Sequence, residues 1–341
     1  MIFNFFKKTS KLLSVALILS LTLVIGLLGG CGTDNTAKNK DKTVNIAIQP
    51  SAAFIPLFVA KEKGWIEADL KAKGVTVNWH NFESGPPMTE SLGTGSSDIG
   101  VIGDVPIVSA IAAGQKNELI AIAAEGPAAY AVLTGKNSTL SNPADFRGKT
   151  IATVVGSTSH NLTQKFLQAG NLSFKDVRMV NISVGDAATV LKNGEADAVS
   201  IWEPNVTRLE ESGAGKIICD GVKVDLLCVN GIVARAEFAQ ANPEIVSIVL
   251  KNYARGVKEL ANLDETTLNN VAKYLSLTPE QLKKVITKYD YTVVIDDKDV
   301  AGLNDTIKFL VNIGRLKNEY DISGYVNREY LKAADVEQYL K

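Results

Sequence analysis

Three hydroxyl side chains follow a glycine at the end of a β-branched run in "TIATVVGSTSHNL", residues 150–162. Gly156 lets the backbone approach a ligand closely because it has no Cβ, and Ser157, Thr158 and Ser159 then stand where a helix begins. A helix start offers unpaired N–H groups and a partial positive charge, so it can hold an oxyanion without any Arg or Lys. The same residue types also make an ordinary helix N-cap. The pattern leaves an anion-binding turn and a simple cap both open.

Four more turns occupy the same kind of position, each directly after a run that we expect to be a strand. They are Gln49-Pro50-Ser51, Ser84-Gly85-Pro86, Gly103-Asp104 and Trp202-Glu203-Pro204. Ligands of parallel sheets collect where strands end and helices begin, so we expect these turns to build one ligand site. The candidate ligand contacts are Gln49, Ser51, Gly85, Pro86, Gly103, Asp104, Gly156, Ser157, Thr158, His160, Trp202 and Glu203.

Two acidic residues in these turns oppose a simple anion site. Asp104 and Glu203 would repel an anion unless their carboxylates bond away from it or meet a cationic group such as an amine. Neutral donors suit a weakly basic, permanently ionised oxyanion such as a sulfonate. Trp202 is either a wall of the site or a core residue, and His160 either donates to the ligand or caps its helix.

Signatures of catalysis and of metal binding are sparse. The chain has 2 histidines, His80 and His160, in different parts of the sequence, so we expect no His-rich metal site. "RGKT" at 147–150 has Pro143 where a P-loop needs a glycine, and a strand follows it. No G-x-S-x-G elbow occurs. We therefore expect no catalytic residue, no metal and no cofactor.

The N-terminus has the layout of a secretory signal peptide. Lysines precede an apolar run that ends near Leu28, and "LLGGC" then leads to Cys31. This ending resembles the bacterial lipobox, in which the cysteine becomes the lipidated first residue. A transmembrane anchor is the alternative, because the apolar run is nearly long enough to span a bilayer. We expect a signal peptide at 1–30, a flexible tether at 31–42, and a lipid anchor on the extracytoplasmic face of a bacterial cell membrane.

The remaining cysteines and the charge exclude some classes of function. Cys219 and Cys228 could form a disulfide outside the cytoplasm or be small buried hydrophobes, and nothing near them in sequence would lower a thiol pKa. The formal net charge is −1 and no Lys/Arg-rich run appears, so nucleic acid is not an expected partner. The chain beyond the tether is long enough for two domains or lobes.

Two α/β units and a helical tail follow one another along the chain. Strand-like runs such as "TVNIAIQ" alternate with helical spacing, for example over 53–74, which predicts a βαβ architecture with mostly parallel sheets. The pattern restarts at "AYAVLTG", and after "NGIVARAEF" come consecutive amphipathic helices.

If the tail joins the first unit, the chain crosses between two lobes twice, near 124–130 and 227–232. Such lobes form a cleft that closes on a ligand by hinge motion. The expected lobes are 43–127 plus 231–341 for lobe I and 128–230 for lobe II.

Three segments, in order, resemble the solute-binding proteins of bacterial ABC importers. They are "VTVNWHNFESGPPMTESLGTGSSDIGVIGDVPIVSAIAAG", "GSTSHNLTQKFLQAGNLSFKDV" and "LKNGEADAVSIWEPNV". The nearest branch is the aliphatic sulfonate-binding family, which is related to the nitrate, taurine and thiamine-precursor binders. The resemblance implies a two-lobe periplasmic-binding-protein-like fold of type II, with the ligand in the interlobe cleft and helices at the C-terminus.

By this resemblance the strand-end turns form the ligand site, and Gln49 supplies a polar contact after the first strand. Glu203 stands where sulfonate binders usually carry Asp, which keeps other ligands open. We expect a lipid-anchored monomer that captures a small organic anion, in the first place an aliphatic sulfonate, and delivers it to an ABC permease. The alternatives are a thiamine-precursor-like heterocycle, taurine or nitrate in the same role, a sensor lipoprotein without transport, and an enzyme on the same fold.

Overall fold

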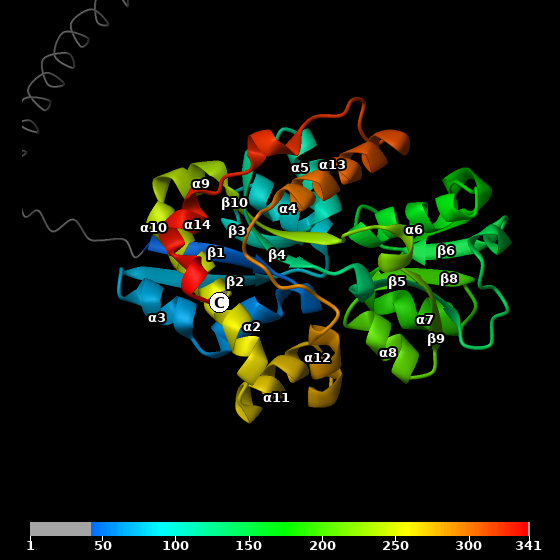
Figure 1. Ribbon diagram of the computed structural model, residues 1–341, viewed down its shortest axis with the longest axis horizontal. Helices are drawn as coiled ribbons and strands as arrows, with labels where there is room; N and C mark the ends of the chain where they lie inside the picture. Colours follow the sequence, from blue (N-terminus) through cyan, green and yellow to red (C-terminus); the bar gives the residue numbers. More distant parts are fainter. Residues whose placement is uncertain (1–41, 340–341) are drawn as a thin grey trace, which may run out of the picture. The chain divides into compact units, whose positions relative to one another are not determined.

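The computed structural model describes residues 42–339, coloured along the chain in Figure 1. The expected signal peptide, the tether up to residue 41 and the lipidated Cys31 lie outside the described residues. Within 42–339 no helix combines the length and the apolar character that crossing a membrane requires. Residues Asp41–Lys341 make one compact unit, and the buried hydrophobic side chains run from Val44 to Val336.

Two five-stranded sheets with helices around them form the framework, which confirms the expected α/β class (Figure 1). The strand order is β2-β1-β3-β10-β4 in the first sheet and β7-β6-β8-β5-β9 in the second. The first sheet consists of β1 (Lys42–Ile48), β2 (Val75–Asn81), β3 (Ile99–Gly103), β4 (Asn117–Glu125) and β10 (Val229–Arg235). The second consists of β5 (Tyr130–Gly135), β6 (Thr150–Thr153), β7 (Arg178–Asn181), β8 (Ala198–Trp202) and β9 (Gly215–Asp220).

In each sheet four of the five strands run in the same direction, as expected, and one strand is reversed, so both sheets are mixed. β1 pairs in parallel with β2 and β3, and β6 with β7 and β8. In contrast, β10 runs antiparallel to β3 and β4, and β5 antiparallel to β8 and β9. β5 and β10 are the strands that the chain enters from the other sheet, through 126–129 and 221–228. They arrive without the crossover helix that makes neighbouring strands parallel.

Helices cover the sheets as the apolar spacing predicts, with one difference. The run at 53–74 forms two helices, because Gly64 has φ +65° and the left-handed backbone stops α2. The helices near the first sheet are α2 (Ile55–Glu62), α3 (Trp65–Lys71), α4 (Gly85–Gly93) and α5 (Asp104–Ala112). Those near the second are α6 (Thr158–Ala169), α7 (Ala187–Lys192) and α8 (Asn205–Glu211).

The tail is helical, as expected, and it reaches elements of both sheets. It comprises α9 (Ala236–Ala241), α10 (Pro243–Glu259), α11 (Glu265–Tyr274), α12 (Pro279–Ile286), α13 (Asp297–Asn312) and α14 (Glu329–Ala334). α10 packs against α2, α3 and α14 beside the first sheet (Figure 1). α13 packs on α5 and also contacts α6, where Lys165 Nζ lies 2.7 Å from Asp305 Oδ2. The lobe boundaries given above stay a prediction.

Close packing of α10 on α2 requires Gly256. A Cβ at this position would lie 2.2 Å from the backbone oxygen of Pro56, so Gly256→Ala must push the two helices apart. We expect the free energy of unfolding in urea to fall by about 1–3 kcal/mol. Gly324→Ala is the control, since a Cβ there has no neighbour within 4 Å. Equal unfolding curves for the two variants would contradict this account of the packing.

Candidate ligand-binding site

Turns from the two sheets meet at a small cavity, called here the inner cavity. Its volume is about 20 Å³, and it is lined by Gln49, Gly85, Gly103, Pro106, Tyr130, Ser157, Thr158, Trp202 and Asn230. Half of the predicted contacts therefore come together at one place, although they come from five separate turns of the chain. None of the residues that line the inner cavity carries a charge. The volume corresponds to about one water-sized group.

The start of α6 presents free backbone donors at the inner cavity. Gly156 has φ +85°, a conformation that favours glycine, and it turns the chain from β6 into the helix. Ser157 occupies the N-cap position, but its hydroxyl donates to the Val154 carbonyl at 2.7 Å instead of capping the helix. Within the described chain the N–H groups of Thr158 and Ser159 have no hydrogen-bond acceptor. These are the groups that can hold an oxyanion.

Two of the three hydroxyl groups do not act as the free donors that the sequence suggested. Ser157 donates to the backbone, and Thr158 Oγ1 donates to Asp104 Oδ1 at 2.5 Å. Ser159 is fully buried, and its Oγ has no hydrogen-bond partner among residues 42–339. The donors at this turn are therefore chiefly backbone N–H groups.

Two buried side chains add neutral donors to the inner cavity. Gln49 is 7% exposed, and its Oε1 has no partner in the described part of the chain. Its amide is thus unsatisfied at the cavity wall, where it can turn Nε2 toward an acceptor. Trp202 is 4% exposed, and no hydrogen bond of its indole N–H is found within 42–339. Trp202 is at once a core residue and a wall of the cavity.

Tyr130, Asn230 and Pro106 also line the inner cavity, and the sequence analysis missed them. Tyr130 donates its hydroxyl to Asn230 Oδ1 at 3.0 Å, while Asn230 Nδ2 donates to the Cys228 carbonyl at 3.0 Å. Burial raises the pKa of Tyr130, so its hydroxyl keeps its proton. The Tyr130 ring lies 6.4 Å from the Trp202 ring. Tyr130 and Asn230 are the first and second residues of strands that the chain enters from the other sheet. This position in the sequence is the signal that could have identified them.

Asp104 does not line the inner cavity; its carboxylate is held by its neighbours. It accepts from Thr158 Oγ1, from Thr306 Oγ1 at 2.8 Å and from the backbone N–H of Val105 at 2.7 Å. Burial raises its pKa, and these donors oppose that rise. The residue ties α5, α6 and α13 together, and its negative charge is directed at these donors.

Glu203 is completely buried behind the inner cavity and bonds away from it. Its oxygens accept from the backbone N–H and the hydroxyl of Thr207, at 3.0 and 2.8 Å. Lys288, from the segment after α12, makes an ion pair with it. The carboxylates of Asp104 and Glu203 are therefore both bonded to other groups, as an anion site requires, and neither is free to repel an anion.

The other predicted residues lie beside the inner cavity. Ser51 accepts from Ala53 N at 3.4 Å and caps a short 3₁₀ helix. Pro86, Gly156 and His160 line a second space, called here the outer cavity, with a volume of about 420 Å³. Its full lining is Pro86, Thr89, Pro106, Ser109, Ala112, Ala113, Val155, Gly156, His160, Leu310, Ile313, Arg315 and Leu316. Which of the predicted residues contact a ligand stays a prediction.

His160 neither caps α6 with its side chain nor carries a charge near neutral pH. Its Nδ1 accepts from the Gly156 N–H at 3.5 Å, and its ring stacks on Phe174 at 4.9 Å. Burial, followed by the nearby charge of Arg315, lowers the pKa of His160 to about 4. The ring is therefore neutral, and with Nδ1 as acceptor its Nε2 carries the proton.

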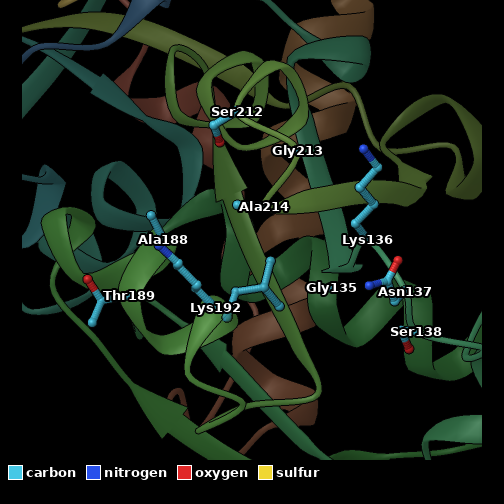
Figure 2. Close-up of a pocket in the computed structure, with 11 residues that line it drawn as sticks. Gly135, Lys136, Asn137, Ser138, Ala188, Thr189, Lys192, Ser212, Gly213 and Ala214 are labelled. Carbon is cyan, nitrogen blue, oxygen red and sulfur yellow. The ribbon is translucent and has the colours of Figure 1, made fainter.

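A larger cavity of about 590 Å³ shares no lining residue with these turns. Figure 2 shows the residues that line it. It is lined from the end of β5, from α7 and from the turn before β9, and it includes Lys136 and Lys192. Both lysines are exposed, and none of the predicted contacts lies there. We assign no site to it.

The two described cysteines are free thiols. Cys219 and Cys228 are both buried, so the structure favours small buried hydrophobes over the disulfide that the sequence left open. Burial raises the pKa of both thiols, which keeps them protonated and poorly nucleophilic. Within 42–339 no group of three or more His, Cys, Asp and Glu side chains has the arrangement of a metal site.

A family model and a relative of known name match most of the chain. The family model described as "NMT1/THI5 like" matches residues 51–267, which include every predicted ligand contact except Gln49. The chain belongs to the NMT1/THI5-like family. A relative from Bacillus subtilis (strain 168), named a putative aliphatic sulfonates-binding protein, is 28% identical over 331 residues, covering 93% of this chain and 96% of the relative. The resemblance found in the sequence is thereby confirmed.

Solved structures confirm the two-lobe periplasmic-binding-protein-like fold of this NMT1/THI5-like chain. The periplasmic aliphatic sulphonate binding protein SsuA from Escherichia coli superposes with a TM-score of 0.75 at 24% identity, covering 84% of this chain and 92% of that one. The desulfurization enzyme DSZB superposes with a TM-score of 0.67 at 15% identity, covering 87% and 99%. The fold alone is thus compatible with binding and with catalysis.

Proposed function

We propose that this chain is the ligand-capturing component of an ABC importer and that its ligand is a small organic anion, an aliphatic sulfonate. It acts as a monomer held by a lipid on Cys31 at the extracytoplasmic face of a bacterial cell membrane. The ligand binds between lobe I and lobe II and is passed to a membrane permease. The name of the Bacillus subtilis relative and the NMT1/THI5-like family support this class.

The observation that carries the proposal is the inner cavity, where neutral donors converge without a free charge. The N–H groups of Thr158 and Ser159, the amide of Gln49 and the indole of Trp202 are unpaired within 42–339. Sulfonate oxygens are ionised at all ordinary pH values and accept several hydrogen bonds, so fixed neutral donors suit them. Because these donors are already held in place by the fold, binding costs little conformational entropy.

Closure around the ligand fits the bonds that join the two sheets. The hydrogen bond from Thr158 to Asp104 and that from Tyr130 to Asn230 each join an element near the second sheet to one near the first. They form only when the lobes are together, so a ligand that bridges the same turns favours the closed arrangement. The closed surface is then what a permease recognises.

The protein from residue 41 onward is expected to gain thermal stability from alkanesulfonates. This part contains all the buried core residues that the structure describes. A ligand that binds only the folded state increases the free energy of unfolding by about 2.7 kcal/mol at a hundredfold excess over Kd, and Tm rises with it. Differential scanning fluorimetry measures the shift for alkanesulfonates, taurine, nitrate, sulfate and thiamine-precursor pyrimidines. A shift with none of the sulfonates would overturn the ligand assignment, and a nitrate or pyrimidine shift would replace it.

An aromatic heterocycle is the second candidate ligand, and one observation favours it. Tyr130 and Trp202 form an aromatic pair at the inner cavity, which can stack on a flat ring. Isothermal titration of the unmodified protein and of Tyr130→Leu with a thiamine-precursor pyrimidine and with an alkanesulfonate decides between the two. The variant should lose affinity for the pyrimidine ring and keep its affinity for the sulfonate.

A further inference from the structure

We propose that the outer cavity receives the body of the ligand and that Arg315 binds a second acidic group at its far end. The favoured cargo is then a sulfonate with an apolar chain and a terminal carboxylate or second sulfonate. This inference rests on the proposed function and names the ligand class of the same site.

The sizes of the two cavities carry the first step. The inner cavity, at about 20 Å³, has room for an oxyanion's leading atoms and little else, whereas the outer cavity, at about 420 Å³, lies in the range of small-molecule sites. Pro106 lines both cavities. Gly85 and Ser157 line the inner cavity, and their chain neighbours Pro86 and Gly156 line the outer one. A ligand held at the start of α6 therefore extends into the outer cavity.

The walls of the outer cavity suit a hydrocarbon chain. They are formed largely by alanine, proline and branched side chains of α4, α5 and the end of α13: Pro86, Pro106, Ala112, Ala113, Leu310, Ile313 and Leu316. Covering these side chains with an apolar chain removes apolar surface from water on both partners. The outer cavity thus favours sulfonates with an extended body over the smallest members of the class.

The polar groups of the outer cavity are donors. Arg315 is exposed, and within 42–339 its guanidinium makes neither an ion pair nor a hydrogen bond. His160 is 6% exposed, and its Nε2–H has no acceptor in the described chain. Ser109 likewise has a hydroxyl that bonds to none of the described residues. No acidic side chain is among the described residues that line the outer cavity.

These donors select the charge of the far end of the ligand. The guanidinium of Arg315 matches a carboxylate or sulfonate, which Arg can bind through two parallel hydrogen bonds. His160 is neutral near pH 7 because burial lowers its pKa to about 4, so it donates without adding charge. An ammonium at this end would meet Arg315 and be repelled.

Isothermal titration of the protein from residue 41 onward tests the inference with two probes, hexanesulfonate and the same chain with a terminal carboxylate. The dianion is expected to bind about tenfold more tightly, which corresponds to 1.4 kcal/mol. Arg315→Gln should abolish this preference, because the dianion then loses a contact that hexanesulfonate does not make. Arg178→Gln is the matched control, because Arg178 is exposed on β7, outside both cavities. A preference that survives in Arg315→Gln, or is absent from the unmodified protein, would overturn the role of Arg315.

A second variant tests the apolar body independently of charge. Ala112 is exposed on α5, so Ala112→Phe fills the outer cavity without disturbing the core. It should weaken hexanesulfonate about tenfold and leave ethanesulfonate binding unchanged. Equal losses for both probes, or none, would overturn the assignment of the outer cavity. Failure of the proposed function has a different signature, since no sulfonate of any length would then bind.

Discussion

Replacement of Lys288 by Met is expected to lower the free energy of unfolding by about 3–5 kcal/mol. The reason is the carboxylate of Glu203, which is completely buried and has Lys288 as its ion-pair partner. Two hydrogen bonds from Thr207 remain in the variant, but the charge itself would be left uncompensated in a medium of low polarity. Chemical denaturation at pH 7 measures the change.

Lys284→Met is the matched control for this experiment. Lys284 pairs with Glu211 at 3.4 Å, but both side chains are well exposed, and such pairs contribute about 0–1 kcal/mol. Adding Glu203→Gln to Lys288→Met should recover part of the loss, because it removes the buried charge. Equal losses for the two lysine variants would contradict the structural role of the buried pair and indicate that neighbouring Arg208 compensates Glu203.

Replacement of Gln49 by Glu is expected to weaken alkanesulfonate binding at least ~100-fold at pH 8, because a carboxylate at the inner cavity would repel the anion by several kcal/mol. Gln49→Leu should lose about tenfold, the effect of one hydrogen bond to a charged group. Burial raises the pKa of a carboxyl group, so affinity of the Glu variant should partly return at pH 5, where the carboxyl gains a proton. Isothermal titration at the two pH values measures both effects.

The control for the added charge is Gln168→Glu. Gln168 is exposed near the end of α6, outside both cavities, so the same change in net charge should leave the affinity unaltered. A similar loss in both variants would point to long-range electrostatics. Unchanged affinity of Gln49→Glu would remove Gln49 from the site and contradict the role of the inner cavity.

Local sequence pattern was sufficient to predict the elements and the turns that meet at the inner cavity. β-branched runs and 3.6-residue spacing depend on neighbours in the chain, and so does the position of a glycine after a strand, as at Gly103 and Gly156. The direction of β5 and β10 depends instead on which sheet each strand joins after leaving the other. That choice is made by packing between distant segments, so the local pattern did not indicate that these two strands are reversed.

The chemistry at individual side chains was harder to predict. The hydroxyl of Ser157 could equally have capped α6, and only the folded backbone brings it to the Val154 carbonyl. The outward bond of Glu203 requires Lys288, which lies 85 positions along the chain. Arg315 follows Gly314 after a helix, as many surface arginines do, so its place at the outer cavity had no sequence signal.

The hydrogen bonds of Asp104 determine when the binding site is completed during folding. A chain that ends after β10 contains every strand of both sheets, yet it lacks Thr306 of α13, which donates to Asp104, and Arg315. Contacts between segments so far apart in sequence form late, after long loops have closed. Folding of the last helices therefore precedes completion of the inner and outer cavities, and the two sheets alone do not make a finished site.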